Sequence, residues 1–334
     1  GNFSIHSFAP HGVQGIETAI SAGGVIFAYL GLTPILSVAS EVKQPQRTIP
    51  IALVASISLA MLVYLLLQTA FIGALPSALL IEGWNGIATR LALPFHDIAL
   101  QLGLVFLAIM VVIDAILSPT GTGNIYMSAT ARVVYAWSKS GTFFPIFQRM
   151  NTERGVPDTA LQLTFGLSLF WTLPFPSWQA LIGVVSSALM LSYAMAPTSA
   201  AALRRTQPNL NRPFKLAYFN ILSPLAFIIA SLIVIWTGWG TLCWLMPALL
   251  ALTAIFLMVM QRKLSATQWH NEIRSSLWMP VYFVGLFLLS WSGPFQGLGL
   301  LNHVWTDGAV ALFALLIHHW AAISGLRPTD EAPF

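Results

Sequence analysis

One apolar stretch decides the fold: residues 23–50 read GGVIFAYLGLTPILSVASEVKQPQRTIP. Gly31 and Pro34 interrupt it, because Pro34 has no amide hydrogen for the carbonyl of Leu30 and Gly31 accepts backbone angles that other residues avoid. A break in a membrane helix leaves backbone groups that lipid cannot satisfy, so it is tolerated only against protein or a water-filled cavity. Broken helices of this kind build the binding sites of several transporters. A simple proline kink in a structural helix is the alternative interpretation.

The composition places the chain in a membrane. Of its 334 residues 57% are hydrophobic and 8% charged, and the mean hydropathy is +0.76. A soluble domain would carry roughly a quarter charged residues. Its one cysteine, Cys243, excludes a disulfide framework within the chain and a cysteine-rich metal site. The fold class we predict is therefore an all-α polytopic membrane protein whose partner is the lipid bilayer.

Apolar runs long enough to cross a bilayer recur along the whole chain. They predict nine membrane helices, at about 22–42, 49–72, 98–131, 159–174, 178–202, 217–237, 241–261, 277–292 and 309–326.

The basic residues predict an orientation for these helices. Of the fifteen lysines and arginines, all except Arg90 follow the first, third, fifth, seventh or ninth predicted helix, which puts them on one side of the membrane. Cytoplasmic loops carry such an excess, so we expect the N-terminal end outside and the C-terminus in the cytoplasm of a cell inner (plasma) membrane. Membrane topology also explains the sequence pI of about 9.4 without a nucleic-acid partner.

The third predicted helix contains an acid, Asp114, within the span. A charge there is costly and by default marks a pathway, a proton relay or an ion site. Ser118 and Gly121 fall on the same helical face as Asp114, and Thr122 adds a hydroxyl nearby. Asp114, Ser118 and Thr122 are therefore candidates for a permeation path or a cation site, whose ion would be a proton or sodium. The alternative is a seam of small residues that lets two helices pack closely.

Charged residues stand at the end of the interrupted stretch. Glu41 is followed by Lys43 and Arg47, so Glu41 and Arg47 are candidates for a cytoplasmic gating ion pair. A solvated helix end is the equally open alternative.

Catalytic signatures are missing from the sequence. It contains no HExxH zinc pattern, no GxSxG elbow and no Walker-type phosphate loop. We therefore predict that the protein is not an enzyme and needs neither a metal nor another cofactor.

Three stretches resemble amino acid permeases of the amino acid–polyamine–organocation superfamily. Residues 23–50 are similar to the sixth helix and following loop of these permeases, although Leu32-Thr33 and Gln44 depart from the usual pattern. The matching residues there are Glu41, Pro45, Arg47, Ile49 and Pro50. The two further stretches, similar to the end of the eighth helix and the loop after the tenth, are SATARVVYAWSKSG (128–141) and AAALRRTQPNLNRPFKL (200–216).

The resemblance implies a fold and a domain organisation. Residues 1–20 would be an external loop before helix 6, and 21–202 the second five-helix inverted repeat of the transporter core. Residues 203–334 would form four peripheral helices and a short cytoplasmic tail, as in fourteen-helix members such as aspartate–proton symporters. Helices 1–5 of the family would then be missing partners of this chain, whose opening residues are typical of an internal loop.

The resemblance also implies a function, which is secondary active transport of amino acids by alternating access, as proton-coupled symport. Residues of the broken helix and of the family's tenth helix would bind the substrate; they are Tyr29, Leu30, Gly31, Leu32, Thr33 and Tyr193. A membrane receptor or scaffold subunit that keeps the permease fold without transport is the alternative.

Overall fold

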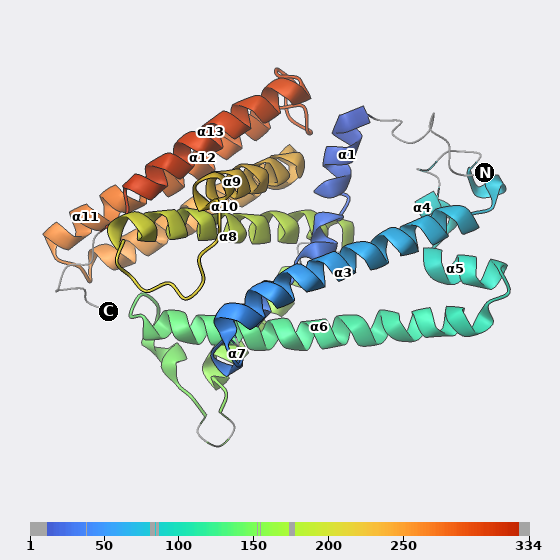
Figure 1. Ribbon diagram of the computed structural model, residues 1–334, viewed down its shortest axis with the longest axis horizontal. Coiled ribbons are helices and arrows are strands. Elements are labelled where there is room, and N and C mark those ends of the chain that lie inside the picture. The colour runs from blue at the N-terminus through green and yellow to red at the C-terminus, as the bar shows by residue number, and fades with distance from the viewer. Residues whose placement is uncertain are drawn as a thin grey trace. The chain divides into compact units, whose positions relative to one another are not determined.

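The computed structural model describes residues 12–37, 39–80, 84, 87–151, 153, 155–173 and 178–326. Contacts within the chain divide it into two compact units, which are described separately. The first unit contains residues 31–170, and the second contains residues 11–30 together with 171–334. Figure 1 shows the helices of both units along the chain. In the described ranges the only strand-like pairing is an isolated bridge between Asn151 and Val156.

The first unit is built around two long helices. These are α3 (Pro45–Ala74) and α6 (Val105–Lys139), of 30 and 35 residues. The shorter elements of this unit are α2 (Thr33–Ser37), η3 (Ala39–Glu41), η4 (Ser77–Leu80), α4 (Ile87–Arg90), α5 (Pro94–Gln101), η6 (Pro145–Gln148) and α7 (Asp158–Thr172), whose last residues are counted with the second unit. No residue of α3 is buried, and such an apolar surface is stable only against lipid or other apolar helices.

The second unit is a helical bundle. Its elements are α1 (Gly12–Ile20), η2 (Ile26–Tyr29), α8 (Trp178–Thr206), α9 (Phe219–Trp236), α10 (Trp239–Gln261), α11 (Ala266–Ser276), α12 (Trp278–Ser292) and α13 (His303–Ile323). In this unit α9 packs against α8 and α13, while α10 packs against α12. The predicted loop of residues 1–20 has a helical part, since the residues described from position 12 onward form α1.

Seven described helices are long and apolar enough to cross a membrane, counting α11 with α12 as one continuous segment. All nine predicted ranges hold helical structure in their described parts. The two that fall short of a full span are 22–42, which is divided into short segments, and 159–174, where α7 has 15 residues. The prediction of an all-α polytopic membrane protein is confirmed, and in the described residues seven of the nine predicted ranges hold a helix long enough to span a membrane.

The predicted helix 98–131 is in fact two helices. Helix α5 ends at Gln101, and Gly103 adopts a φ of +74°, which favours glycine. The amide of Leu104 donates to the carbonyl of Ala99 at 2.8 Å, and that of Gly103 to Leu100 at 3.0 Å. These two bonds satisfy the last carbonyls of α5 in a Schellman motif, so the chain can turn before α6 begins.

The core of the second unit combines close packing with buried hydrogen bonds between helices. Tyr282, Phe227 and Leu286 are completely buried. Tyr282 of α12 and Ser231 of α9 place their hydroxyl oxygens 2.8 Å apart. Because lipid is as apolar as leucine, helices in a membrane associate through packing and such polar contacts rather than through the hydrophobic effect.

Replacing Leu286 with alanine should destabilise the second unit. The side chain is completely buried, so its removal leaves a cavity and should cost about 2 kcal/mol or more. Thermal unfolding in detergent measures the loss. Leu288→Ala is the matched control, since Leu288 lies on the same helix and is 50% exposed. Equal destabilisation by both substitutions would contradict the packing described here.

Candidate functional site

The predicted break in the first apolar stretch is present, at a slightly different place. Helix η2 ends at Tyr29, Leu30 is extended with φ −74° and ψ 151°, and α2 begins at Thr33. Pro34 was expected to lie inside the break, but it occupies the first turn of α2. A proline there costs no hydrogen bond, because the first amides of a helix have no partner within it.

Gly31 carries the sharpest turn of this break. Its φ of +131° lies in a region that residues with a side chain rarely adopt. A methyl group added to Gly31 would lie 3.7 Å from the hydroxyl oxygen of Tyr126 on α6, an ordinary contact. Backbone conformation, rather than lack of space, therefore requires glycine at this position.

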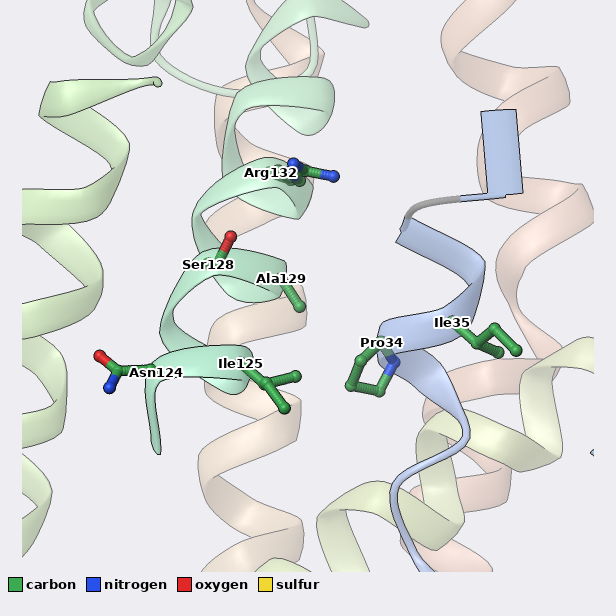
Figure 2. A pocket seen from close by; sticks show the side chains of 7 residues that line it. All are labelled: Pro34, Ile35, Asn124, Ile125, Ser128, Ala129 and Arg132. Atoms are coloured by element: carbon green, nitrogen blue, oxygen red, sulfur yellow. The ribbon is translucent and has the colours of Figure 1, made fainter. Parts of the chain in front are cut away.

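Helix α2 packs against the second half of α6, and a cavity of about 470 Å³ lies between them. Figure 2 shows Pro34 and Ile35 on α2 and Ile125 and Ala129 on α6 around this space. The size falls in the range of small-molecule sites, which combine mostly apolar walls with a few polar groups. The polar groups here are the side chains of Asn124, Ser128 and Arg132, which also line the cavity.

A second cavity of the same unit, of about 590 Å³, shares these three polar residues. It extends between α6 and the start of α7, where Pro157 and Leu161 line it. In Figure 2, Asn124 projects away from Pro34 and Ile35, so one polar stripe of α6 serves two cavities.

An ion pair lies beside the cavities. Nη1 of Arg132 donates to Oε1 of Glu41 at 3.0 Å, which joins α6 to the end of the interrupted stretch. The two side chains are 43% and 64% exposed, so the pair contributes at most about 1 kcal/mol to stability. Arg47, the predicted partner of Glu41, is exposed and forms no ion pair in the described part of the chain. Glu41 therefore pairs with Arg132 in this structure, and a gating role for Glu41 and Arg47 stays a prediction.

The predicted ion-binding residues lie on another part of α6. Asp114, Ser118 and Thr122 are exposed and line neither cavity. Asp114 precedes Asn124 by ten residues, about 15 Å along the helix axis. Within the described residues no hydrogen bond or ion pair involves the side chain of Asp114. A role in binding a coupling ion stays a prediction.

The predicted substrate-binding residues are divided between the two units. Gly31, Leu32 and Thr33 belong to the first unit, and Tyr29 belongs to the second. Leu30 and Tyr193, also of the second unit, are half-buried and pack against its core. The structure describes the backbone of Thr33 only, as the first residue of α2.

The polar stripe of α6 can be recognised from residue spacing in the sequence, although it was not among the predicted sites. Asn124, Ser128 and Arg132 follow one another at intervals of four residues, which places them on one helical face. This spacing alone predicts a polar stripe. That α2 lies opposite depends on a tertiary contact that no local pattern encodes.

A broken helix beside a polar-lined cavity, together with seven candidate spans, is an arrangement also found in membrane transporters. Residues 1–256 match a family model described as amino acid permease, so the chain belongs to the amino acid permease family. The family and the relatives below are permeases and transporters rather than enzymes, as the missing catalytic motifs predicted.

Three relatives with known roles illustrate the family. An aspartate-proton symporter of Bacillus subtilis is 47% identical over 330 residues, which are 97% of this chain and 63% of that protein. A glutamate/serine transporter of the same organism is 32% identical over 323 residues, 96% of this chain and 59% of that protein. Mouse cationic amino acid transporter 4 is 26% identical over 197 residues, 59% and 29% of the two chains.

The chain thus spans about three-fifths of the length of its two more similar relatives. No solved structure matches it.

A double-mutant cycle on Glu41 and Arg132 should show a coupling of up to about 1 kcal/mol. The variants are Glu41→Gln, Arg132→Gln and the pair, compared by thermal unfolding in detergent. The cycle of Glu41→Gln with Arg47→Gln is the control and should give no coupling, because these side chains are not paired. Stronger coupling to Arg47 than to Arg132 would overturn the assignment.

Proposed function

We propose that the protein to which this chain belongs is a secondary active transporter of amino acids, working by alternating access and coupled to protons. It would lie in the plasma membrane with the C-terminus in the cytoplasm, as the distribution of basic residues predicts. Membership of the amino acid permease family supports the general activity. The aspartate-proton symporter among its relatives supports the coupling ion.

One observation carries this proposal: the break at Leu30–Leu32 adjoins a helix that packs beside a cavity in the first unit. The break leaves helical ends available to a solute, and broken helices bind substrates and ions through these ends. In this proposal Gly31 and Leu32 offer backbone groups to the ammonium group of the substrate. Tyr29, Leu30, Thr33 and Tyr193 complete the site.

For the substrate we propose an acidic amino acid. The names of the two more similar relatives include aspartate and glutamate, respectively. The remaining part of the site would come from the family's first five helices, which correspond to the part of the relatives that this chain does not span. Transport assays therefore need the full-length protein.

For the coupling site we propose Asp114, with Ser118 and Thr122 as neighbours on α6. An acid in a membrane helix requires a partner or a proton, which suits a residue that is protonated and deprotonated in each transport cycle. Glu41 would contribute to a cytoplasmic gate through its ion pair with Arg132.

Replacing Asp114 with asparagine should abolish uphill uptake and leave exchange intact. Asparagine keeps the size of the side chain but cannot release a proton, so the accumulation ratio in proteoliposomes with a proton gradient should fall to about one. Asp97→Asn is the control, because Asp97 pairs with His96 in the short helix α5. If the Asp114 variant concentrates aspartate normally, another group carries the proton.

Replacing Gly31 with alanine should reduce the uptake rate by about fivefold or more. A side chain at a φ of +131° adds roughly 1–3 kcal/mol of strain, and each 1.4 kcal/mol corresponds to a factor of ten. Gly166→Ala on α7 is the control, since a methyl group there meets nothing within 4 Å. Uptake of labelled aspartate by cells that express the full-length protein provides the measurement.

These assays also separate transport from the alternative function. A receptor or scaffold on the same fold would give no uptake above background in the unsubstituted protein. It would also tolerate the change at Gly31 far better than a transporter.

A further inference from the structure

The second unit contains a buried acid that the functions above do not use. Glu17 lies on α1 and is only 5% exposed, the one buried residue of this helix. Helix α1 packs against α9, and Ile20 at its end contacts the core of the unit. Ser21, which follows α1, is completely buried and donates to the backbone carbonyl of Glu17 at 3.0 Å.

A second carboxyl faces this acid. The side chain of Asp307, near the start of α13, lies within hydrogen-bonding reach of the Glu17 carboxyl. The indole Nε1 of Trp236, the last residue of α9, donates to Oδ1 of Asp307 at 2.9 Å. Oε2 of Glu17 is buried and has no hydrogen-bond donor among the described residues. Helix α1, the end of α9 and the start of α13 therefore meet at two carboxyl groups. The indole of Trp236 is the one hydrogen-bond donor described at this pair.

Two carboxylates in contact cannot both remain charged without a large repulsion, and one shared proton removes it. Burial, then the hydrogen bond to Asp307, then the negative charge of Asp307 raise the pKa of Glu17 to about 7. The protonated carboxyl of Glu17 supplies the donor that the structure otherwise lacks at this position.

Other ionisable groups on the packed elements do not neutralise the pair. Helix α9 has no ionisable side chain, and the only one on α12 is Tyr282, whose hydroxyl contacts Ser231. His303 lies one turn before Asp307 and forms no hydrogen bond with either acid in the described structure. The remaining ionisable groups of α8 and α13 are Tyr193, Arg204, Arg205, His318 and His319.

Two of these groups are held far from the acids. Arg204 stacks over Phe219, and Nε2 of His318 lies 2.8 Å from Oγ of Ser223. Phe219 and Ser223 are at the beginning of α9, which places them about 20–25 Å along its axis from Trp236.

We propose that Glu17 and Asp307 form a proton-binding site, in which one proton shared by the two carboxyls holds α1 against α9 and α13. Loss of this proton leaves two negative charges in contact and releases α1. The ligand is the proton itself, and the site requires no substrate, so this proposal is independent of transport and of the role of Asp114.

The raised pKa of Glu17 determines how the stability of the α1 contact depends on pH. The folded pKa of Glu17 is raised, so the contribution of the contact to stability is fully present below the ordinary carboxyl pKa of 4.5. It is lost as the pH rises through about 7. Helix α1 is therefore released above neutral pH.

Thiol labelling of Ser21→Cys tests this release in the full-length protein, with Cys243 and any other reactive cysteine replaced. Ser21 is buried while α1 is in place. Its labelling rate is divided by that of Val13→Cys, on the exposed face of α1, to remove the intrinsic pH dependence of thiols. We expect this ratio to rise at least about tenfold from one pH unit below to one above neutrality.

Glu17→Gln and Asp307→Asn are the decisive variants, since each amide can donate to the remaining carboxylate as the proton does. In both variants the labelling ratio of Ser21→Cys to Val13→Cys should stay low at every pH. Glu272→Gln, on the exposed face of α11, is the control and should leave the pH dependence of this ratio unchanged. A ratio that does not change with pH, or a dependence that persists in Glu17→Gln, overturns the proposal.

Infrared spectroscopy of the unsubstituted protein gives a second test, which does not depend on the folding of any variant. The carbonyl band of a protonated carboxyl should disappear with a midpoint near pH 7. A midpoint in the ordinary range of about 4 for every carboxyl would contradict a shared proton.

Discussion

Every backbone amide and carbonyl inside a bilayer needs a partner, and this constraint governs the protein. Helices satisfy it internally, which is why α3 can lack any buried residue and still be stable in lipid. The chain departs from the rule at Leu30–Leu32, between two short helical segments. The backbone groups freed at such a break are tolerated only beside protein or a water-filled cavity, so the position of the break is constrained by its surroundings.

The second unit meets the same constraint with side chains. Its helices carry hydroxyls in their buried faces, and these bond across the bundle: Ser187 to Thr237, Ser223 to His318, and Ser231 to Tyr282. Each pair satisfies a polar group that would be costly alone in an apolar interior. The Glu17 and Asp307 pair differs from these three, because two acceptors face one another. A proton is the simplest way to convert one of them into a donor.

Much of the fold could be predicted from the sequence because hydrophobic length is a local property. The apolar runs identified the positions of the membrane helices, and Gly31 predicted a break, since only glycine adopts its φ easily. Local patterns failed where a nearby residue ended a helix, as Gly103 does, or where a residue could serve two roles, as Pro34 does. Proline breaks a helix interior but is favourable in a first turn, and the sequence alone did not distinguish these.

The candidate site was less predictable because the formation of an ion pair depends on distance in space and not on distance along the chain. Arg47 is near Glu41 in sequence, yet Arg132 of α6, 91 residues away, forms the ion pair. Glu17 falls in the stretch that was expected to be an external loop, and it is buried where α1 packs on α9. Distances along the chain cannot identify such partners, whereas a polar stripe such as 124, 128 and 132 can be identified from spacing alone.

The boundary between the two compact units passes between Leu30 and Gly31, at the break itself. Residues 30–32 belong to neither helical segment, so rotating the backbone at this point interrupts no ladder of helical hydrogen bonds. The same rotation in the middle of α6 would disrupt several such bonds and expose their groups to lipid. Bending stiffness is therefore unevenly distributed along the chain, and it is lower at Gly31 than in the middle of a long helix such as α6.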